Sequence, residues 1–456
     1  HIDCCSHIYH ARLTEGLDDS LGIPAMSNSF DDIAGCANSL LVIGSNLTEQ
    51  HPVFGAHIRQ AILRRKVKMV VVNPDFTNIA EYAALALYPH PKTETALVNG
   101  LMHIILEKGW EDAAFVAKYP DGFAEFRAVI KKYTPHKTAE ITGLSVEALY
   151  QAAEILATNR PTAVLWSVGL VDPSAGRGNV QSLANLQLLL GNLDVPGGGV
   201  NPLGGQNNIQ GACDMGCLPE FLPGYRRVTD EAARAQFERA WGTTIPTETG
   251  LRAAQMLNAA GQGQIKALYL YGEDILNTST LGAQLRRDLQ SCEFVVLQEI
   301  LPSEATRYAD VLLPGVSFAE KSGTYTSAER RIQMIHQAIE PIGEARPDWR
   351  IIADVARRIL ADESRPIQAA EYSAWDYDTP EQIFQEISAL TPIYAGIAYE
   401  RLKRGERLQW PVDNAEHTGT PILRCGYFSD GRARWTPIEQ TPLNLRPSKT
   451  QEFSRV

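Results

Sequence analysis

The first ten residues of the chain, HIDCCSHIYH, contain three histidines and two cysteines. Imidazole and thiolate groups are common metal ligands, so this density raises the question of a metal site. The two cysteines are adjacent, however, and the irregular histidine spacing matches no zinc-binding pattern. From these residues alone, a metal site and a segment without a metal remain open alternatives.

A second stretch suited to chemistry is PGGGVNPLGGQNNIQGACDMG, residues 196–216, which contains seven glycines, three asparagines and two glutamines. Glycine lets the backbone approach a flat or bulky group, and side-chain amides donate and accept hydrogen bonds without carrying charge. The composition disfavours a helix or a strand, and a flexible linker would look similar. The apolar residues 183–193 predict a buried helix leading into the stretch, which favours an ordered loop.

We expect Gly205→Val to strain this loop and destabilise the fold.

The overall composition limits the class of protein. A chain of 456 residues predicts two or three domains. The net charge of -11 argues against nucleic acid or an anionic membrane as a partner. No apolar run reaches the roughly 18 residues that a membrane span needs, and no signal peptide opens the chain. The seven cysteines include no Cys-x-x-Cys pair, which favours reduced thiols and a cytoplasmic location.

Apolar runs alternate with amphipathic segments in both halves of the chain. Strands are predicted at residues 39–46, 67–73, 162–169, 266–274, 293–299 and 309–315, with helices between them. This order predicts an α/β fold of two doubly wound, Rossmann-like domains with parallel sheets and additional helices. Ligands in such sheets bind beyond the carboxyl ends of the strands, which here means residues 44–46 and 73–75.

The expected domain organisation has four parts. Residues 1–34 form a lead-in segment, and residues 35–220 form the first α/β domain. Residues 221–405 form the second α/β domain. Residues 406–456 lack periodicity and read as an extended arm, whose apolar pieces lie across a partner or lead into a closing domain.

Several motifs together resemble one family. They are DCCSHIYH at the start, AMSNSFDDI at 25–33, GQNNIQGACDMG in the loop, YGEDIL at 271–276 and GTYTSAERRIQ at 323–333. The chain resembles the formate dehydrogenase alpha-subunit branch of the molybdopterin oxidoreductases, specifically domains II and III of the formate dehydrogenase/DMSO reductase fold. The resemblance implies two molybdopterin guanine dinucleotides that chelate molybdenum or tungsten. It implies that the cofactors contact Gly44, Asn46, Gly205, Gln206, Asn207, Gly211, Asp214, Gly272, Glu273 and Gln298.

The sequence departs from this family where the chemistry takes place. The family places a selenocysteine or cysteine metal ligand at the position of Tyr9, and a phenol is an unlikely substitute for a soft ligand. The family's substrate-orienting arginine is replaced by Gly204, whereas His10 keeps the place of the proposed proton relay. Asp75 stands where the family has a phosphate-binding arginine, and Lys92 follows as a candidate replacement cation.

Two functions follow from the resemblance. One is an active molybdenum or tungsten oxidoreductase that oxidises formate or another small substrate and passes electrons to iron–sulfur clusters. The other is a catalytically degenerate subunit of an electron-transfer complex, like the G subunit of NADH:quinone oxidoreductase, in which the pterin cofactor is either kept or lost. Both imply a 4Fe-4S domain or subunit as partner, and a cytoplasmic location that reaches the membrane only through a complex.

Overall fold

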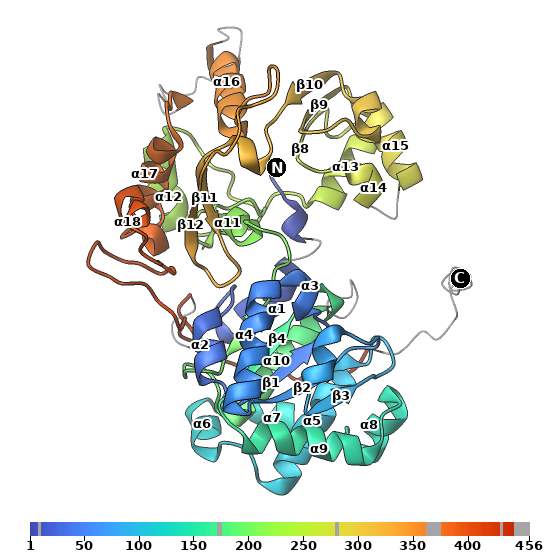
Figure 1. Ribbon diagram of the computed structural model, residues 1–456. Helices are drawn as coiled ribbons and strands as arrows, with labels where there is room; N and C mark the ends of the chain where they lie inside the picture. Colours follow the sequence, from blue (N-terminus) through green and yellow to red (C-terminus); the bar gives the residue numbers. More distant parts are fainter. Residues whose placement is uncertain (8–10, 171–175, 279–281, 362–374, 429–431, 442–456) are drawn as a thin grey trace. The chain divides into compact units, whose positions relative to one another are not determined.

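The computed structural model describes residues 1–7, 11–170, 176–278, 282–361, 375–428 and 432–441 (Figure 1). Two compact units make up the chain. The five-stranded unit consists of Arg12–Gly205 and Pro421–Val456, and the three-stranded unit consists of His1–Ala11 and Gln206–Thr420. These boundaries differ from the expected 35–220 and 221–405 for two reasons. The amide-rich loop leaves the five-stranded unit after Gly205, and the chain returns to that unit at Pro421.

The five-stranded unit is built on a parallel sheet with strand order β3-β2-β1-β4-β5. The strands are β1 (Ser39–Ile43), β2 (Lys68–Val72), β3 (Leu85–Leu87), β4 (Thr162–Trp166) and β5 (Val200–Pro202). In register, Ile43 of β1 pairs with Val72 of β2 and with Trp166 of β4. The predicted strands of this half are therefore confirmed, and their carboxyl ends lie at one edge of the sheet.

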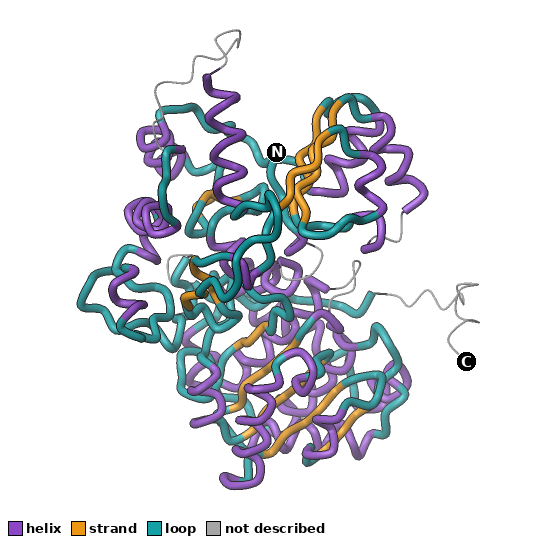
Figure 2. Tube along the Cα trace, turned by 45° about the horizontal axis from the view of Figure 1, so that its top comes forward, coloured by secondary structure: helices purple, strands orange, loops and turns teal. Residues whose placement is uncertain are grey.

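Helices cover both faces of this sheet, as Figure 2 shows. One face packs on α2 (Phe30–Cys36) and α4 (Pro52–Arg65) through side chains such as Ile58. The other face packs on α9 (Val146–Thr158) and α10 (Gly176–Leu190). Every residue of β1 and β4 is buried, which is the usual condition of a parallel sheet. The remaining helical segments are α1 (Ala11–Leu21), α3 (Leu47–Gln50), η2 (Asn78–Tyr82), α5 (Glu94–Lys108), α6 (Ala113–Lys118), α7 (Phe123–Ile130), α8 (Pro135–Thr142) and η3 (Val168–Leu170).

The three-stranded unit contains a second parallel sheet, with strand order β10-β9-β8. Its strands are β8 (Ala267–Tyr271), β9 (Phe294–Glu299) and β10 (Val311–Pro314). One face packs on α13 (Ala253–Gly261) and α15 (Gly282–Ser291) around Leu268 and Leu297. The expected second parallel sheet is confirmed.

The rest of the three-stranded unit consists of short elements around two hairpins. The hairpins pair β6 (Phe221–Leu222) with β7 (Arg226–Arg227), and β11 (Gly323–Thr326) with β12 (Ile332–Ile335). The helical segments are η1 (Cys5–His7), α11 (Ile209–Asp214), α12 (Glu231–Trp241), α14 (Ile275–Thr278), η4 (Glu304–Tyr308), η5 (Phe318–Glu320), α16 (Asp348–Ala361), α17 (Pro380–Leu390), η7 (Pro392–Tyr394) and α18 (Tyr399–Lys403). The expectation that residues 196–216 form only loop was wrong, since β5 and α11 lie within this stretch. No helix in the described residues combines the length and apolar character needed to cross a membrane.

Residues 421–428 and 432–441 pack along the five-stranded unit, and we call them the C-terminal strap. Leu423 donates its backbone N–H to the carbonyl of Ser27 at 2.7 Å, and Arg434 donates to the carbonyl of Ser20 at 2.8 Å. Trp435 is buried among aromatic rings. Most of these apolar pieces therefore pack on their own chain, and their contact with a partner or a closing domain stays a prediction.

Candidate functional site

The carboxyl end of β1 carries two of the predicted site residues, Gly44 and Asn46. Gly44 has a φ of 58°, and a Cβ there would lie 2.5 Å from the backbone nitrogen of Leu170. Glycine is therefore required here by the close approach of two backbone segments. Asn46 precedes α3, and its Oδ1 accepts a hydrogen bond from the hydroxyl of Thr48 at 2.8 Å.

Four buried polar atoms lie at this carboxyl edge without a hydrogen-bond partner among the described residues. They are Ser45 Oγ, Gln50 Oε1, His51 Nε2 and Trp166 Nε1. Burial lowers the pKa of His51, so its imidazole is neutral at pH 7. Buried polar groups are rarely left unpaired, which makes this edge suited to an uncharged, hydrogen-bonding part of a ligand. The sequence analysis included Ser45 in the expected ligand-binding residues 44–46, but it missed Gln50, His51 and Trp166.

The glycines of the loop differ in what surrounds them. A Cβ on Gly199, which has a φ of 83°, would lie 1.9 Å from Asn28 Oδ1 and 2.1 Å from Ser27 Oγ. A Cβ on Gly205 would meet nothing within 4 Å. The expectation that Gly205→Val strains the fold was therefore wrong, because the position offers open space and the constrained glycine is Gly199.

We expect Gly199→Ala to destabilise the five-stranded unit by roughly 2–4 kcal/mol through backbone strain and overlap. Ser27 and Asn28 cannot move aside cheaply, because Ser27 Oγ accepts from Val200 N and Asn28 Nδ2 donates to the carbonyl of Val195. Gly205→Ala is the matched control and should leave the unfolding midpoint unchanged. Urea unfolding followed by circular dichroism would measure both, and equal losses would contradict the assignment.

The amides after Gly205 begin the three-stranded unit. Gln206 and Asn207 are exposed, and the thiol of Cys5 donates to Gln206 Oε1 at 3.6 Å. The segment before Tyr9 therefore lies against the amide-rich loop. Gly211 is a packing glycine, because a Cβ there would lie 2.2 Å from Asn208 Oδ1.

Asp214 is fully buried, and its carboxylate is held by side chains of the same unit. Its Oδ2 accepts hydrogen bonds from Tyr394 Oη and Trp410 Nε1, each at 2.7 Å, and its Oδ1 accepts one from Gln210 Nε2 at 2.8 Å. Burial raises the pKa of Asp214 to about 6 although these hydrogen bonds favour the charged form. These hydrogen bonds hold the end of α11 in place.

This raised pKa predicts a dependence of stability on pH. The folded protein binds a proton at Asp214 more tightly than the unfolded chain does, so this contribution to stability is present at pH 4 and lost as the pH rises to 6. Relative to Asp214→Asn, the wild-type protein should gain up to about 3 kcal/mol of unfolding free energy between pH 7 and pH 4. Urea unfolding of both proteins across this range would measure the difference, and a pH-independent difference would contradict the raised pKa.

The N-terminal segment is held by a network of charges. Asp3 contacts His7 Nδ1, and Glu220 lies 3.5 Å from His7 Nε2 and 2.8 Å from Arg252. Burial alone would lower the pKa of His7, but Asp3 and Glu220 raise it to about 9. Tyr9 and His10 lie outside the described residues. Among the residues that are described, no three His, Cys, Asp or Glu side chains come together as a metal site.

The second group of predicted residues lies at the carboxyl edge of the three-stranded sheet. Gly272 directly follows β8, has a φ of 60° and donates its backbone N–H to the carbonyl of Gln298 at 3.0 Å. Gln298 is fully buried in β9, where its Oε1 accepts from Tyr269 Oη and its Nε2 donates to Asp348 Oδ1 at 2.9 Å. The structure therefore brings Gly272, Glu273 and Gln298 to one edge and adds Asp348.

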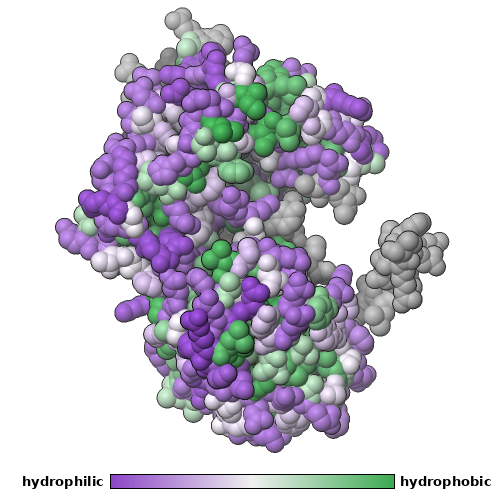
Figure 3. All heavy atoms as spheres, in the orientation of Figure 1, coloured by the Kyte–Doolittle hydropathy of each residue, from purple (hydrophilic) through white to green (hydrophobic). Residues whose placement is uncertain are grey.

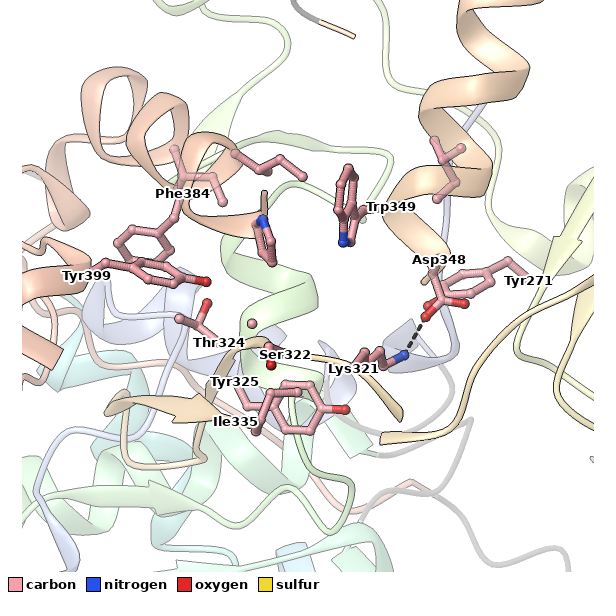
Figure 4. A pocket seen from close by; sticks show the side chains of 15 residues that line it. Tyr271, Lys321, Ser322, Thr324, Tyr325, Ile335, Asp348, Trp349, Phe384 and Tyr399 are labelled. Atoms are coloured by element: carbon pink, nitrogen blue, oxygen red, sulfur yellow. Dashed lines mark hydrogen bonds and ion pairs between the residues drawn. The ribbon is translucent and has the colours of Figure 1, made fainter. Parts of the chain in front are cut away.

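Asp348 also contacts Lys321, and both residues line a cavity of about 310 Å³ (Figure 4). The other walls are mostly aromatic and aliphatic, including Tyr325, Trp349 and Phe384. Burial and the charge of Asp348 raise the pKa of Tyr271, so its phenol stays protonated. Asp348 and Lys321 were missed by the sequence analysis, because their link to Gln298 spans tens of residues.

Several carboxylates lie close together at this edge. Burial raises the pKa of Glu299, and the carboxylates of Asp274 and Glu273 raise it further. In the five-stranded unit, Asp75 and Lys92 are both exposed. The described edges thus offer mainly neutral amides, hydroxyls and carboxylates, which suit the N–H groups of a heterocycle better than a small anion.

Comparison with known proteins identifies the family. Residues 4–358 match the family model of molybdopterin oxidoreductases. The chain is 35% identical over 454 residues to the F420-dependent formate dehydrogenase subunit alpha of Methanocaldococcus jannaschii, covering 99% of this chain and 65% of that protein. It is 35% identical over 411 residues to formate dehydrogenase H of Escherichia coli, covering 90% of this chain and 56% of that protein. The solved structure of acetylene hydratase from Pelobacter acetylenicus shares the fold, with a TM-score of 0.66 and 19% identity over 95% of this chain and 61% of that one.

The chain spans less than two thirds of the length of these relatives. The similarity to the alpha subunits nevertheless runs along nearly the whole chain, and the shared α/β fold confirms the expected architecture. The chain belongs to the molybdopterin oxidoreductase family.

Proposed function

We propose that this chain is a formate-dehydrogenase-like subunit of an electron-transfer complex that binds a molybdopterin-type cofactor but does not oxidise formate. The observation that carries the proposal is the pair of substitutions at the chemical centre. Tyr9 takes the position of the metal ligand, and the loop has Gly204 in place of the substrate-orienting arginine.

The residues present fit the organic part of such a cofactor. One set of buried donors and acceptors has no hydrogen-bond partner within the described part of the chain: Ser45 Oγ, Gln50 Oε1, His51 Nε2 and Trp166 Nε1. In the other unit, Gln206 provides an exposed side-chain amide. A pterin or guanine ring presents several N–H and carbonyl groups, and such groups satisfy buried polar atoms of this kind.

The residues fit an anionic substrate less well. In the family, the bound cofactor supplies two-electron chemistry at its metal, and the protein must hold formate beside it. A carboxylate is best held by a forked guanidinium, which Gly204 cannot provide. At the described sheet edges, His51 is neutral and Lys321 is engaged by Asp348.

We place the subunit in the cytoplasm with an iron–sulfur domain or subunit as electron partner. The seven cysteines are all free thiols in the structure. Burial raises the pKa of Cys4 and raises the pKa of Cys5 to about 11, so both remain protonated at neutral pH. Cys4 and Cys5 are therefore poor replacements for the metal ligand whose position Tyr9 occupies.

The second candidate function is an active molybdenum or tungsten enzyme for a small neutral substrate, which is favoured by the uncharged polar atoms at the carboxyl edge of the five-stranded sheet. Elemental analysis for molybdenum and tungsten, together with pterin fluorescence after acid release, tests the proposal on protein purified from its native cell. Pterin without formate turnover supports it. Absence of pterin would point to a purely structural subunit, and formate turnover would overturn the proposal.

A further inference from the structure

The turn that leads into α11, which we call the amide turn (residues 206–208), exposes the side chains of Gln206 and Asn207, whereas Asn208 is half-buried. The apolar surface of the three-stranded unit instead gathers where Figure 1 places β10 and α16 (Figure 3). The amide turn therefore offers uncharged donors and acceptors to a ligand. Such groups bind a ligand well only if the backbone that carries them is already held in the required shape.

Asn208 has a backbone conformation that few residues adopt. Its φ is 64° and its ψ is 8°, in the left-handed region, directly before the first residue of α11. Asparagine tolerates this region better than most residues with a side chain, although the conformation still carries strain. Such a conformation persists only where other contacts stabilise it.

The side chain of Asn208 supplies a stabilising contact. Rather than accepting from an N–H of α11, its Oδ1 accepts a hydrogen bond from the backbone N–H of Thr326 at 3.0 Å. Thr326 is the last residue of β11 in the two-stranded sheet β11-β12, and the outer edge of such a strand carries N–H groups that need partners outside the sheet. The same Oδ1 lies so close to Gly211 that a Cβ there would come within 2.2 Å of it. Asn208 is thus tied to a strand 118 residues later in the chain.

The hydroxyl of Thr326 reaches the other end of α11. Thr326 Oγ1 lies 2.9 Å from Tyr394 Oη, which donates to Asp214 Oδ2 at 2.7 Å. Thr326 is 5% exposed and Tyr394 is 2% exposed, so water competes little for these hydrogen bonds. Both ends of α11, at Asn208 and at Asp214, are therefore fixed to the same strand within one unit.

We propose that Asn208 is a positioning residue for the amide turn. By anchoring its Oδ1 to Thr326, it sets the direction in which Gln206 and Asn207 offer their amides to a flat, uncharged heterocycle of the pterin type. Asn208 acts through these two neighbours and does not touch the ligand. The identity of the ligand rests on the proposed function, whereas the anchoring of the turn does not. The two adjacent asparagines thus have different roles, Asn207 toward the ligand and Asn208 toward the fold.

Hydrogen exchange of residues 206–212 and the pterin content, measured on protein purified from its native cell, test this proposal. Asn208→Gly keeps the left-handed backbone but removes the anchor. We expect it to speed exchange of these amides by about tenfold or more and to lower the pterin content by about tenfold.

Two matched variants separate positioning from ligand contact. Asn208→Asp keeps an acceptor at the same place and tolerates the left-handed region, so it should retain the exchange and the pterin content of the wild type. Asn207→Ala should lower the pterin content while the exchange of residues 206–212 in the cofactor-free protein stays unchanged. The thermal midpoint of each variant shows that it is folded.

Other results would overturn the proposal. Equal exchange in the wild type and in Asn208→Gly would show that the anchor does not hold the turn, and loss of pterin without faster exchange would make Asn208 a direct ligand contact. Faster exchange in Asn208→Asp would also contradict it, and this test remains if Asn208→Gly does not fold. Faster exchange in Asn208→Gly with no pterin in the wild type would contradict the proposed function and leave the anchoring confirmed.

Discussion

Formate-dependent reduction of an artificial dye by the purified protein is expected to stay below roughly one thousandth of the rate of Escherichia coli formate dehydrogenase H assayed beside it. Two losses produce this result. Tyr9 offers a phenol, which in tyrosine has a reference pKa near 10 and is a hard, bulky ligand, and Gly204 leaves formate without a guanidinium. Each loss removes stabilisation that a working site would apply in the transition state.

Single and double variants at positions 9 and 204 test whether both substitutions cause the loss of formate turnover. Tyr9→Cys and Gly204→Arg should each leave formate turnover undetectable, because each restores only one of two necessary groups. The double variant is necessary for any gain, and Tyr9→Phe serves as a control that should change nothing. Gly204 is buried, so the thermal midpoint of the Gly204→Arg variant must be measured to exclude misfolding. Formate turnover by the wild-type protein with bound metal would contradict the prediction.

The strands could be predicted from the sequence because their signal is local. Residues 67–73, VKMVVVN, form an apolar, β-branched run, and β2 (Lys68–Val72) falls within it. Such runs occur where both faces of a parallel sheet are buried. The same rule applied to β8 and β9 predicts a fully covered sheet, and the exposed Tyr269 and Phe294 are where the three-stranded unit departs from it.

The site could be predicted only in part, because its packing depends on contacts between distant residues. Composition alone does not distinguish Gly199, which touches Ser27 and Asn28, from Gly205, which faces open space. Likewise, the buried state of Asp214 depends on Tyr394 and Trp410, nearly two hundred residues later in the chain. The resemblance placed Gly205 and Asp214 at the cofactor, but it did not indicate that Asp214 is buried in the fold.

The structure of the C-terminal strap also could not be predicted from the sequence, because it depends on contacts with distant residues. Its residues have no periodic pattern, so no regular element could be predicted there, and none of its described residues lies in a helix or strand. Its order comes from backbone and side-chain contacts with distant segments: Asn99 Nδ2 donates to the carbonyl of Ile438 at 2.8 Å, and Asn185 Nδ2 donates to that of Thr436 at 2.6 Å. These bonds join the strap to α5 and α10, which form part of the helical layer on the sheet.

Trp435→Ala is expected to destabilise the five-stranded unit by about 3–5 kcal/mol, the usual cost of removing a large buried aromatic side chain. Trp435 is 3% exposed, and its ring centroid lies 5.0 Å from that of Phe123 and 4.6 Å from that of Phe126. Its Nε1 donates to the carbonyl of Tyr119 at 2.6 Å. Tyr427→Ala, at an exposed strap position, is the control and should cost less than about 1 kcal/mol. Urea unfolding measures the loss, and hydrogen exchange should show faster exchange in α7 than in the three-stranded sheet. If Trp435→Ala is as stable as Tyr427→Ala, the strap contributes little and the last residues are dispensable to the fold.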